Sequence, residues 1–164
     1  MNACVVGFAA MFVAGCTASG GPIASVAGVY VGSVTNDGST CPGLMLDKGM
    51  MNSVVVLTIA QMEANVTMGV DGLTSPPLQA VFGTNSFAGS VIENHIDATI
   101  TGTVPATLGN CMYTLNGELA ANLGGDILTG NIIYTPQTNG HADCKSMLVT
   151  GCIGKQTFGF TRNP

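Results

Sequence analysis

Three side chains that could bind a metal stand at alternate positions of one segment. Glu93, His95 and Asp97 lie two residues apart, so they share one face if the segment is a β-strand. Carboxylate and imidazole groups on one face can hold a divalent cation. Glu93, however, lies in a predicted turn, and the surrounding alternation is typical of a polar face in contact with water. We therefore interpret the set as a solvated outer face and predict no metal site.

A second histidine and carboxylate, His141 and Asp143, lie in a predicted loop next to Gly140. A histidine acts as a general base when it contacts a nucleophile or a water molecule, and the sequence indicates no such partner. The Gly-x-Ser-x-Gly nucleophile motif is also missing from the sequence. We interpret the pair as part of a surface turn, and we predict that the protein is not an enzyme.

Methionine thioethers offer a third kind of chemistry. Met45, Met50 and Met51 lie close together in the sequence, with Met112 as a distant fourth, and soft thioether sulfur binds Cu(I). Methionine also fills gaps and makes adaptable apolar contacts, which is the interpretation that we favour. We therefore expect no cofactor.

The N-terminus carries an apolar run that ends at a cysteine. Residues 1–15, MNACVVGFAAMFVAG, are too short for a membrane-spanning helix, which needs about 20 residues, and are typical of a secretory signal peptide. The sequence Val13-Ala14-Gly15-Cys16 resembles the lipobox of bacterial lipoproteins. This resemblance implies that residues 1–15 are removed and that Cys16 carries the lipid. A signal peptide without lipidation, or a buried first strand, is the alternative.

The segment after Cys16 is small and rich in glycine, TASGGPIA, and Pro22 interrupts it. Such a composition favours a flexible tether. We therefore predict a lipidated tether over residues 16–24 and a single folded domain over residues 25–164.

Four cysteines remain if Cys4 is lost with the signal peptide and Cys16 is lipidated. An even number in an exported chain suggests two disulfides. A zinc site is the weaker alternative, because no pair has the C-x₂-C spacing. The four are Cys41, Cys111, Cys144 and Cys152.

The composition excludes one class of partner. The chain has 164 residues, of which 46% are apolar and 8% are charged, and its net charge is −5. Only 4 residues are lysine or arginine, so no basic surface can neutralise a nucleic-acid backbone. We therefore expect no nucleic-acid binding.

Apolar and polar residues alternate along most of the domain, which is typical of strands with one buried face. Residues 111–135 show the pattern most clearly, with two strands around a turn at residues 122–126. We expect no helix beyond the signal peptide, and residues 78–82 are a candidate short edge strand. The eight predicted main strands are 26–35, 53–62, 65–70, 86–92, 95–104, 111–121, 127–135 and 156–162.

The spacing of these strands favours an antiparallel up-and-down meander that closes into a barrel of about eight strands. Long loops alternate with short turns, and glycines such as Gly32 and Gly117 fall on the apolar face, where they permit sharp coiling. The plan resembles the architecture of lipocalins and avidins, without the lipocalin Gly-x-Trp motif. A β-sandwich is the alternative fold. A barrel embedded in the outer membrane is disfavoured by polar outer faces and an aromatic content of 5%.

This topology predicts the disulfide pairing, because all four cysteines fall at the barrel end that carries the long loops. Cys111 begins one strand and Cys144 ends the loop that follows the neighbouring strand. Cys41 follows the first strand and Cys152 precedes the last, and these two strands must meet to close a barrel. We therefore predict the pairs Cys111–Cys144 and Cys41–Cys152.

Two functions fit these features, and neither is catalytic. The first is a lipid-anchored scaffold or interaction module of the bacterial cell envelope, at the outer membrane, with another envelope protein as its partner. The second is a lipocalin-like binder of a small apolar ligand in the barrel, because inward glycines would leave space there. The residues expected to line such a space are Tyr30, Ile100, Tyr113, Leu115, Ile132 and Tyr134.

Overall fold

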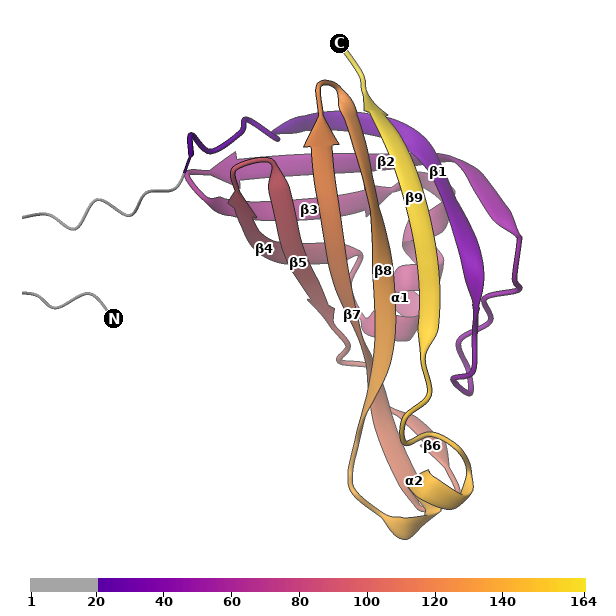
Figure 1. The fold of residues 1–164 in the computed structure, drawn as a ribbon. Coiled ribbons are helices and arrows are strands. Elements are labelled where there is room, and N and C mark those ends of the chain that lie inside the picture. The colour runs from indigo at the N-terminus through magenta and orange to yellow at the C-terminus, as the bar shows by residue number, and fades with distance from the viewer. Residues whose placement is uncertain (1–20) are drawn as a thin grey trace, which may run out of the picture.

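The predicted alternation produces long strands that bury one face each. The computed structural model describes residues 21–164, so the predicted signal peptide and Cys16 lie outside the described residues. Within residues 21–164, eight antiparallel strands form a closed barrel (Figure 1). These strands are β1 (Gly28–Ser39), β2 (Met51–Met62), β3 (Asn65–Asp71), β4 (Ser86–Ile92), β5 (His95–Thr101), β7 (Cys111–Gly124), β8 (Ile127–Thr138) and β9 (Gly154–Arg162).

The barrel closes where its first and last strands, which are distant in the sequence, pair with each other. β1 pairs with β2 on one side and with β9 on the other, so the first and last strands meet. β5 pairs with β7 along its whole length, from His95 opposite Asn122 to Thr101 opposite Asn116. These pairings confirm the predicted up-and-down barrel. One further short strand, β6 (Ala106–Leu108), lies outside the barrel wall and pairs only with β7.

Helices interrupt two of the long connections, so the expectation of no helix in the domain is wrong. The candidate edge strand at residues 78–82 is instead part of α1 (Ser75–Phe82), which follows a single 3₁₀ turn, η1 (Gly72–Thr74). Proline opens α1 because its fixed φ suits the first helical turn, and Gly83 ends it at a φ of 78°. A second helix, α2 (Ala142–Ser146), occupies the connection between β8 and β9.

The two ends of the barrel differ as the loop lengths predict. One end carries the long connections of residues 40–50, 72–85, 102–110 and 139–153, and we call it the wide-loop rim. The other end carries two-residue turns and is called the turn rim. The turn between β7 and β8 is shorter than the predicted 122–126, because alternation continues to Gly124 and only Gly125 and Asp126 remain outside the strands.

β7 and β8 continue past the barrel wall at the wide-loop rim and form an arm with β6 and α2 at its tip (Figure 1). Both predicted disulfides are confirmed at this rim. Cys111 is bonded to Cys144, which ties α2 to the start of β7. Cys41 is bonded to Cys152, which ties the loop after β1 to the segment before β9.

The inner faces of the strands fill the barrel with apolar side chains. Met68, Phe87, Ile96 and Leu128 are at most 1% exposed, although they come from four different strands. The glycines of the barrel wall do not leave the empty interior that was expected, because the backbone of a neighbouring strand lies where their side chains would be. A Cβ atom at Gly32, for example, would overlap the backbone carbonyl of Gly159.

The N-terminal residues of the described part cover the turn rim. The backbone N–H of Ala24 donates to the carbonyl of Glu93 over 2.7 Å, and that of Val26 donates to Oε1 of Gln61 over 2.7 Å. Residues 21–27 therefore run from the turn between β4 and β5 to the start of β1 (Figure 1). Val26 is fully buried by this arrangement.

Candidate functional site

The structure brings His95 and Asp97 together without Glu93. Nε2 of His95 lies 3.1 Å from Oδ1 of Asp97, and Nδ1 lies 2.9 Å from Oδ1 of Asn122 on β7. The hydrogen bond to Asn122, and then the Asp97 carboxylate, raise the pKa of His95 above its ordinary value. Glu93 turns instead to the N-terminal segment, where Oε1 accepts from the N–H of Gly21 over 3.4 Å. Within residues 21–164, no three His, Cys, Asp or Glu side chains are grouped to hold a metal ion.

His141 and Asp143 make hydrogen bonds that hold the local structure around α2. Nδ1 of His141 accepts from the backbone N–H of Asp143 over 3.2 Å and so caps the start of α2. Asp143 accepts from the backbone N–H of Asn110 over 2.9 Å and from its side-chain amide over 3.0 Å. The backbone N–H of Asn110 is the main reason that the pKa of Asp143 lies below its ordinary value. These contacts join α2 to the turn between β6 and β7.

The methionines considered for copper lie at the wide-loop rim. Met45, Met50 and Met51 are 91%, 52% and 59% exposed, on and next to the loop after β1. Met112 is half exposed on the arm, where it pairs with Thr107 of β6. Exposed methionine supplies apolar contact surface.

The three tyrosines lie on inner faces, and each hydroxyl has a partner. Tyr30 donates to the carbonyl of Val26 over 2.9 Å and accepts from Arg162, whose Nη2 is 2.7 Å away. Tyr134 donates to Oε1 of Gln156 over 2.7 Å, and burial raises its pKa far above the ordinary value. Tyr113 donates to the carbonyl of Pro42 over 2.8 Å.

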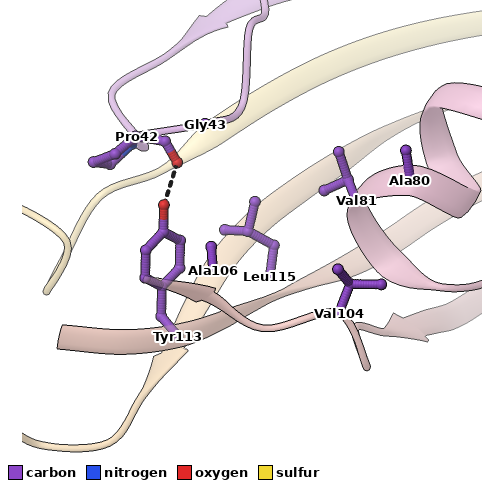
Figure 2. Close-up of a pocket in the computed structure, with 8 residues that line it drawn as sticks. All are labelled: Pro42, Gly43, Ala80, Val81, Val104, Ala106, Tyr113 and Leu115. Carbon is purple, nitrogen blue, oxygen red and sulfur yellow. Dashed lines mark hydrogen bonds between the residues drawn. The ribbon is translucent and has the colours of Figure 1, made fainter. Parts of the chain in front are cut away.

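An apolar cleft of about 180 Å³ opens at the wide-loop rim, between α1 and the arm (Figure 2). Its wall on one side comes from α1, and its wall on the other side comes from β6 and β7. The loop after β1 closes one end, where Tyr113 holds Pro42 by the hydrogen bond described above. The lining residues are Pro42, Gly43, Ala80, Val81, Val104, Ala106, Tyr113 and Leu115.

Only two of the six residues predicted to line a ligand site line this cleft. Tyr113 and Leu115 line it, whereas Tyr30, Ile100, Ile132 and Tyr134 are buried in the packed interior at 0–7% exposure. The other lining residues were not predicted. Val81 and Ala80 come from a helix that the sequence did not reveal, and Pro42 and Gly43 come from a loop, for which periodicity carries no signal. Val104 was predicted to end the strand 95–104, but β5 stops at Thr101 and Val104 lies in the connection that follows.

The cleft is chemically simple. None of its eight lining side chains carries a charge, and the one hydroxyl, on Tyr113, already donates its hydrogen to Pro42. Catalysis needs a nucleophile, an acid, a base or a metal, and this lining offers none. What the cleft offers is apolar surface in contact with solvent, because Ala80 and Val104 are exposed.

Exposed apolar side chains are also concentrated around the cleft's end of the barrel. A typical monomer shows such residues scattered singly, whereas here most of the large ones belong to the wide-loop rim. They are Met45, Met50, Met51, Val54, Leu73, Val104, Leu108, Met112, Met147, Leu148 and Ile153.

A second hollow, of about 360 Å³, lies on the outer wall over β4, β5, β7 and β8. Its lining includes small residues such as Ala88 and Ala120 together with the acidic residues Asp97 and Glu118. It lacks the apolar enclosure that a specific ligand site usually provides. The cleft at the wide-loop rim is therefore the stronger candidate.

Comparisons with protein families, with curated proteins and with solved structures find no match to this chain. Among residues 21–164, the helices are too short or too polar to cross a membrane.

Proposed function

We propose that the protein is a lipid-anchored, non-catalytic interaction module of the bacterial cell envelope, and that it binds an apolar group in the cleft at the wide-loop rim. The cleft is the observation that carries this proposal. It is open and uncharged, and it lies at the rim that carries most of the exposed large apolar side chains, as the centre of a binding surface does.

The position of the N-terminus supports the same arrangement. Cys16 to Gly20 is five residues long, which reaches at most about 17 Å. This segment joins the described domain at the turn rim, where Ala24 bonds to Glu93. A lipid on Cys16 would therefore hold the turn rim towards the membrane, and the cleft would face away from it. The 12 residues of β1 put the two rims about 30 Å apart along the barrel axis.

A small apolar molecule is the second candidate occupant of the cleft. About 180 Å³ is close to the size of a cavity that takes benzene, roughly 150 Å³. It is smaller than the sites of drug-sized ligands, roughly 300–1,000 Å³. The occupant is therefore one ring or a short hydrocarbon segment, in contrast to the larger ligands implied by a hollow barrel.

Benzene is the probe that tests the site. Titration into the ¹⁵N- and ¹³C-labelled domain should shift the NMR signals of Val104, Ala106 and Leu115, while the methyl signals of Ile132 in the core stay unchanged. Ala80→Phe should fill the cleft and abolish the shifts. Gln79→Phe is the matched control, because it adds the same ring to the same helix outside the lining. The proposal would be contradicted if the Ile132 signals shift more than those of the cleft residues, or if no signal of a cleft residue shifts.

Lipidation has a separate test. Production of the full chain in a bacterial host supplied with a labelled fatty acid should label the protein and place it in the membrane fraction. Cys16→Ser should remove the label and release the protein, whereas Cys4→Ser should change neither result. An unlabelled wild-type chain would contradict the anchored form.

A further inference from the structure

Among the strands of residues 21–164, β6 has one edge without a strand partner. Ala106, Thr107 and Leu108 pair with Tyr113, Met112 and Cys111 of β7, and β6 is the last strand in the sheet order. Thr107 and Leu108 are exposed. The backbone N–H and C=O groups on the outer edge of such a strand are available to pair with another extended chain.

The free edge borders the cleft directly. Ala106 belongs to β6 and lines the cleft, and so does Tyr113, its partner on β7 (Figure 2). Cross-strand partners carry their side chains on the same face of a sheet. A strand added to β6 opposite Ala106 would therefore point one side chain to this face, over the cleft.

The size and chemistry of the cleft fit one apolar side chain. Its volume of about 180 Å³ accepts a Leu, Ile or Phe side chain. The lining has no charged group to receive a carboxylate or an ammonium, so the polar part of the occupant must lie outside the cleft. A peptide meets this condition, because its backbone would pair with β6 while one side chain enters the cleft.

The described ends of this chain lie at the rim opposite the cleft. Gly21, the first described residue, and Ala24 both contact Glu93 at the turn rim. In the lipid-anchored form proposed above, residues 16–20 would reach about 17 Å, which is less than the roughly 30 Å between the rims. The C-terminus also lies at the turn rim, since the N–H of Arg162 donates to the carbonyl of Asp126.

We propose that an extended segment of a partner protein adds to the free edge of β6 and seats one apolar side chain in the cleft. This inference rests on the proposed function and names its class of partner. Backbone pairing supplies the orientation of the segment, and the cleft supplies its selectivity for a single apolar residue.

The probes are blocked heptapeptides, acetyl-Ser-Thr-Val-Xaa-Val-Thr-Ser-amide, in which Xaa is Phe, Leu, Ile or Ala. NMR titration of the domain should show at least one apolar member binding with a dissociation constant below about 1 mM. The shifted signals should include the amides of Ala106 to Leu108 together with the cleft residues. The Ala member should bind at least about tenfold more weakly than the best apolar member.

Two analogues of the best peptide separate strand addition from simple hydrophobic contact. Each carries N-methyl groups on alternate amides, so that one analogue has the methyl groups on the edge facing β6 and the other has them on the opposite edge. We expect one analogue to lose binding by at least about tenfold and the other to keep it. Ala80→Phe should abolish peptide binding, and Gln79→Phe should preserve it.

Three results would overturn this inference. The first is that no peptide binds, and the second is that both methylated analogues bind equally well. The third is a shift of the β6 signals with protein concentration alone, which would make a second copy of the chain the occupant. If benzene enters the cleft while every peptide fails, the proposed function stands and the peptide inference falls. If benzene also fails, the proposed function falls.

Discussion

The ring of Phe82 packs against the ring of Tyr134 inside the mouth of the barrel, with the centroids 5.5 Å apart and the planes tilted by 34°. Phe82 is the last residue of α1, and it is 1% exposed. The carbonyl of Phe82 also accepts from the N–H of Thr103 over 2.9 Å. The hydroxyl of Thr103 donates to the same carbonyl over 3.2 Å, and Leu78 and Val81 pack against the core. Phe82 is thus the one fully buried anchor of α1, which forms one wall of the cleft.

Phe82→Ala should lower the free energy of unfolding by about 3–5 kcal/mol, because it removes a buried ring and leaves a cavity beside Tyr134. Urea denaturation followed by circular dichroism measures the change. Leu73→Ala is the control, since Leu73 is 95% exposed in the same connection and its loss should change stability by less than about 0.5 kcal/mol. Equal effects of the two substitutions would mean that Phe82 is not an anchor.

α1 also shows where reasoning from the sequence fails. Pro76 and Pro77 indicate a loop when read as chain breakers, whereas in the structure they occupy the first turn of a helix, where a missing N–H costs nothing. The helix is only 8 residues long and places few side chains in the core, so its apolar period is too short to recognise. The strands, in contrast, are long. Residues such as Ile96 and Leu115 therefore repeat often enough to define a buried face.

The disulfide pairs could also be predicted, because the predicted strands close into a barrel and this closure determines which loops lie next to each other. The cleft was not predictable. Ala106 lies in a predicted loop, and Val104 ends the predicted strand 95–104, whereas β5 stops at Thr101. Their role depends on how β6 folds back on β7. Gly32 was predicted to leave space on the inner face. Instead, the absence of its side chain lets the backbone of Gly159 approach closely.

The hydroxyl of Tyr30 makes three hydrogen bonds, whereas that of Tyr113 makes one. In Tyr30→Phe, Arg162 loses the oxygen that accepts from both Nε and Nη2, over 3.0 and 2.7 Å. We expect a loss of about 2 kcal/mol, because hydrogen bonds to charged groups are stronger than neutral ones. Tyr113→Phe removes one bond, to Pro42, and should cost about 1 kcal/mol. Urea denaturation of both variants tests the order, and a larger loss for Tyr113→Phe would contradict it.

The two disulfides should differ in their contribution to stability. Cys41 and Cys152 are 111 residues apart, and Cys111 and Cys144 are 33 apart. The loop-closure entropy of the unfolded chain predicts contributions of about 5 and about 4 kcal/mol. The double variant Cys41→Ser/Cys152→Ser should therefore be less stable than Cys111→Ser/Cys144→Ser by about 1 kcal/mol in urea denaturation. The opposite order would show that native contacts in the arm outweigh loop length.

Asp143 should make the tip of the arm sensitive to acid. Its carboxylate accepts from the backbone N–H and the side chain of Asn110, and these bonds favour the charged form, so the pKa of Asp143 lies below its ordinary value. Because the folded-state pKa is lowered, the stabilisation is present above the ordinary value near 3.8 and is lost as the pH falls through the folded-state value. We therefore expect the amide proton of Asn110 to shift upfield in acid, with a midpoint below 3.8.

The change should stay local, because the disulfide between Cys111 and Cys144 still ties α2 to β7 when the carboxylate is neutral. Asp143→Asn should give at pH 7 the Asn110 signal that the wild-type protein gives in acid, with little change in the urea midpoint. Asp47→Asn, at an exposed position of another loop, should leave that signal unchanged. If the Asn110 signal of the wild-type protein moves only above pH 3.8, the carboxylate gains nothing from Asn110, and the disulfide alone holds α2 to the turn beside β6.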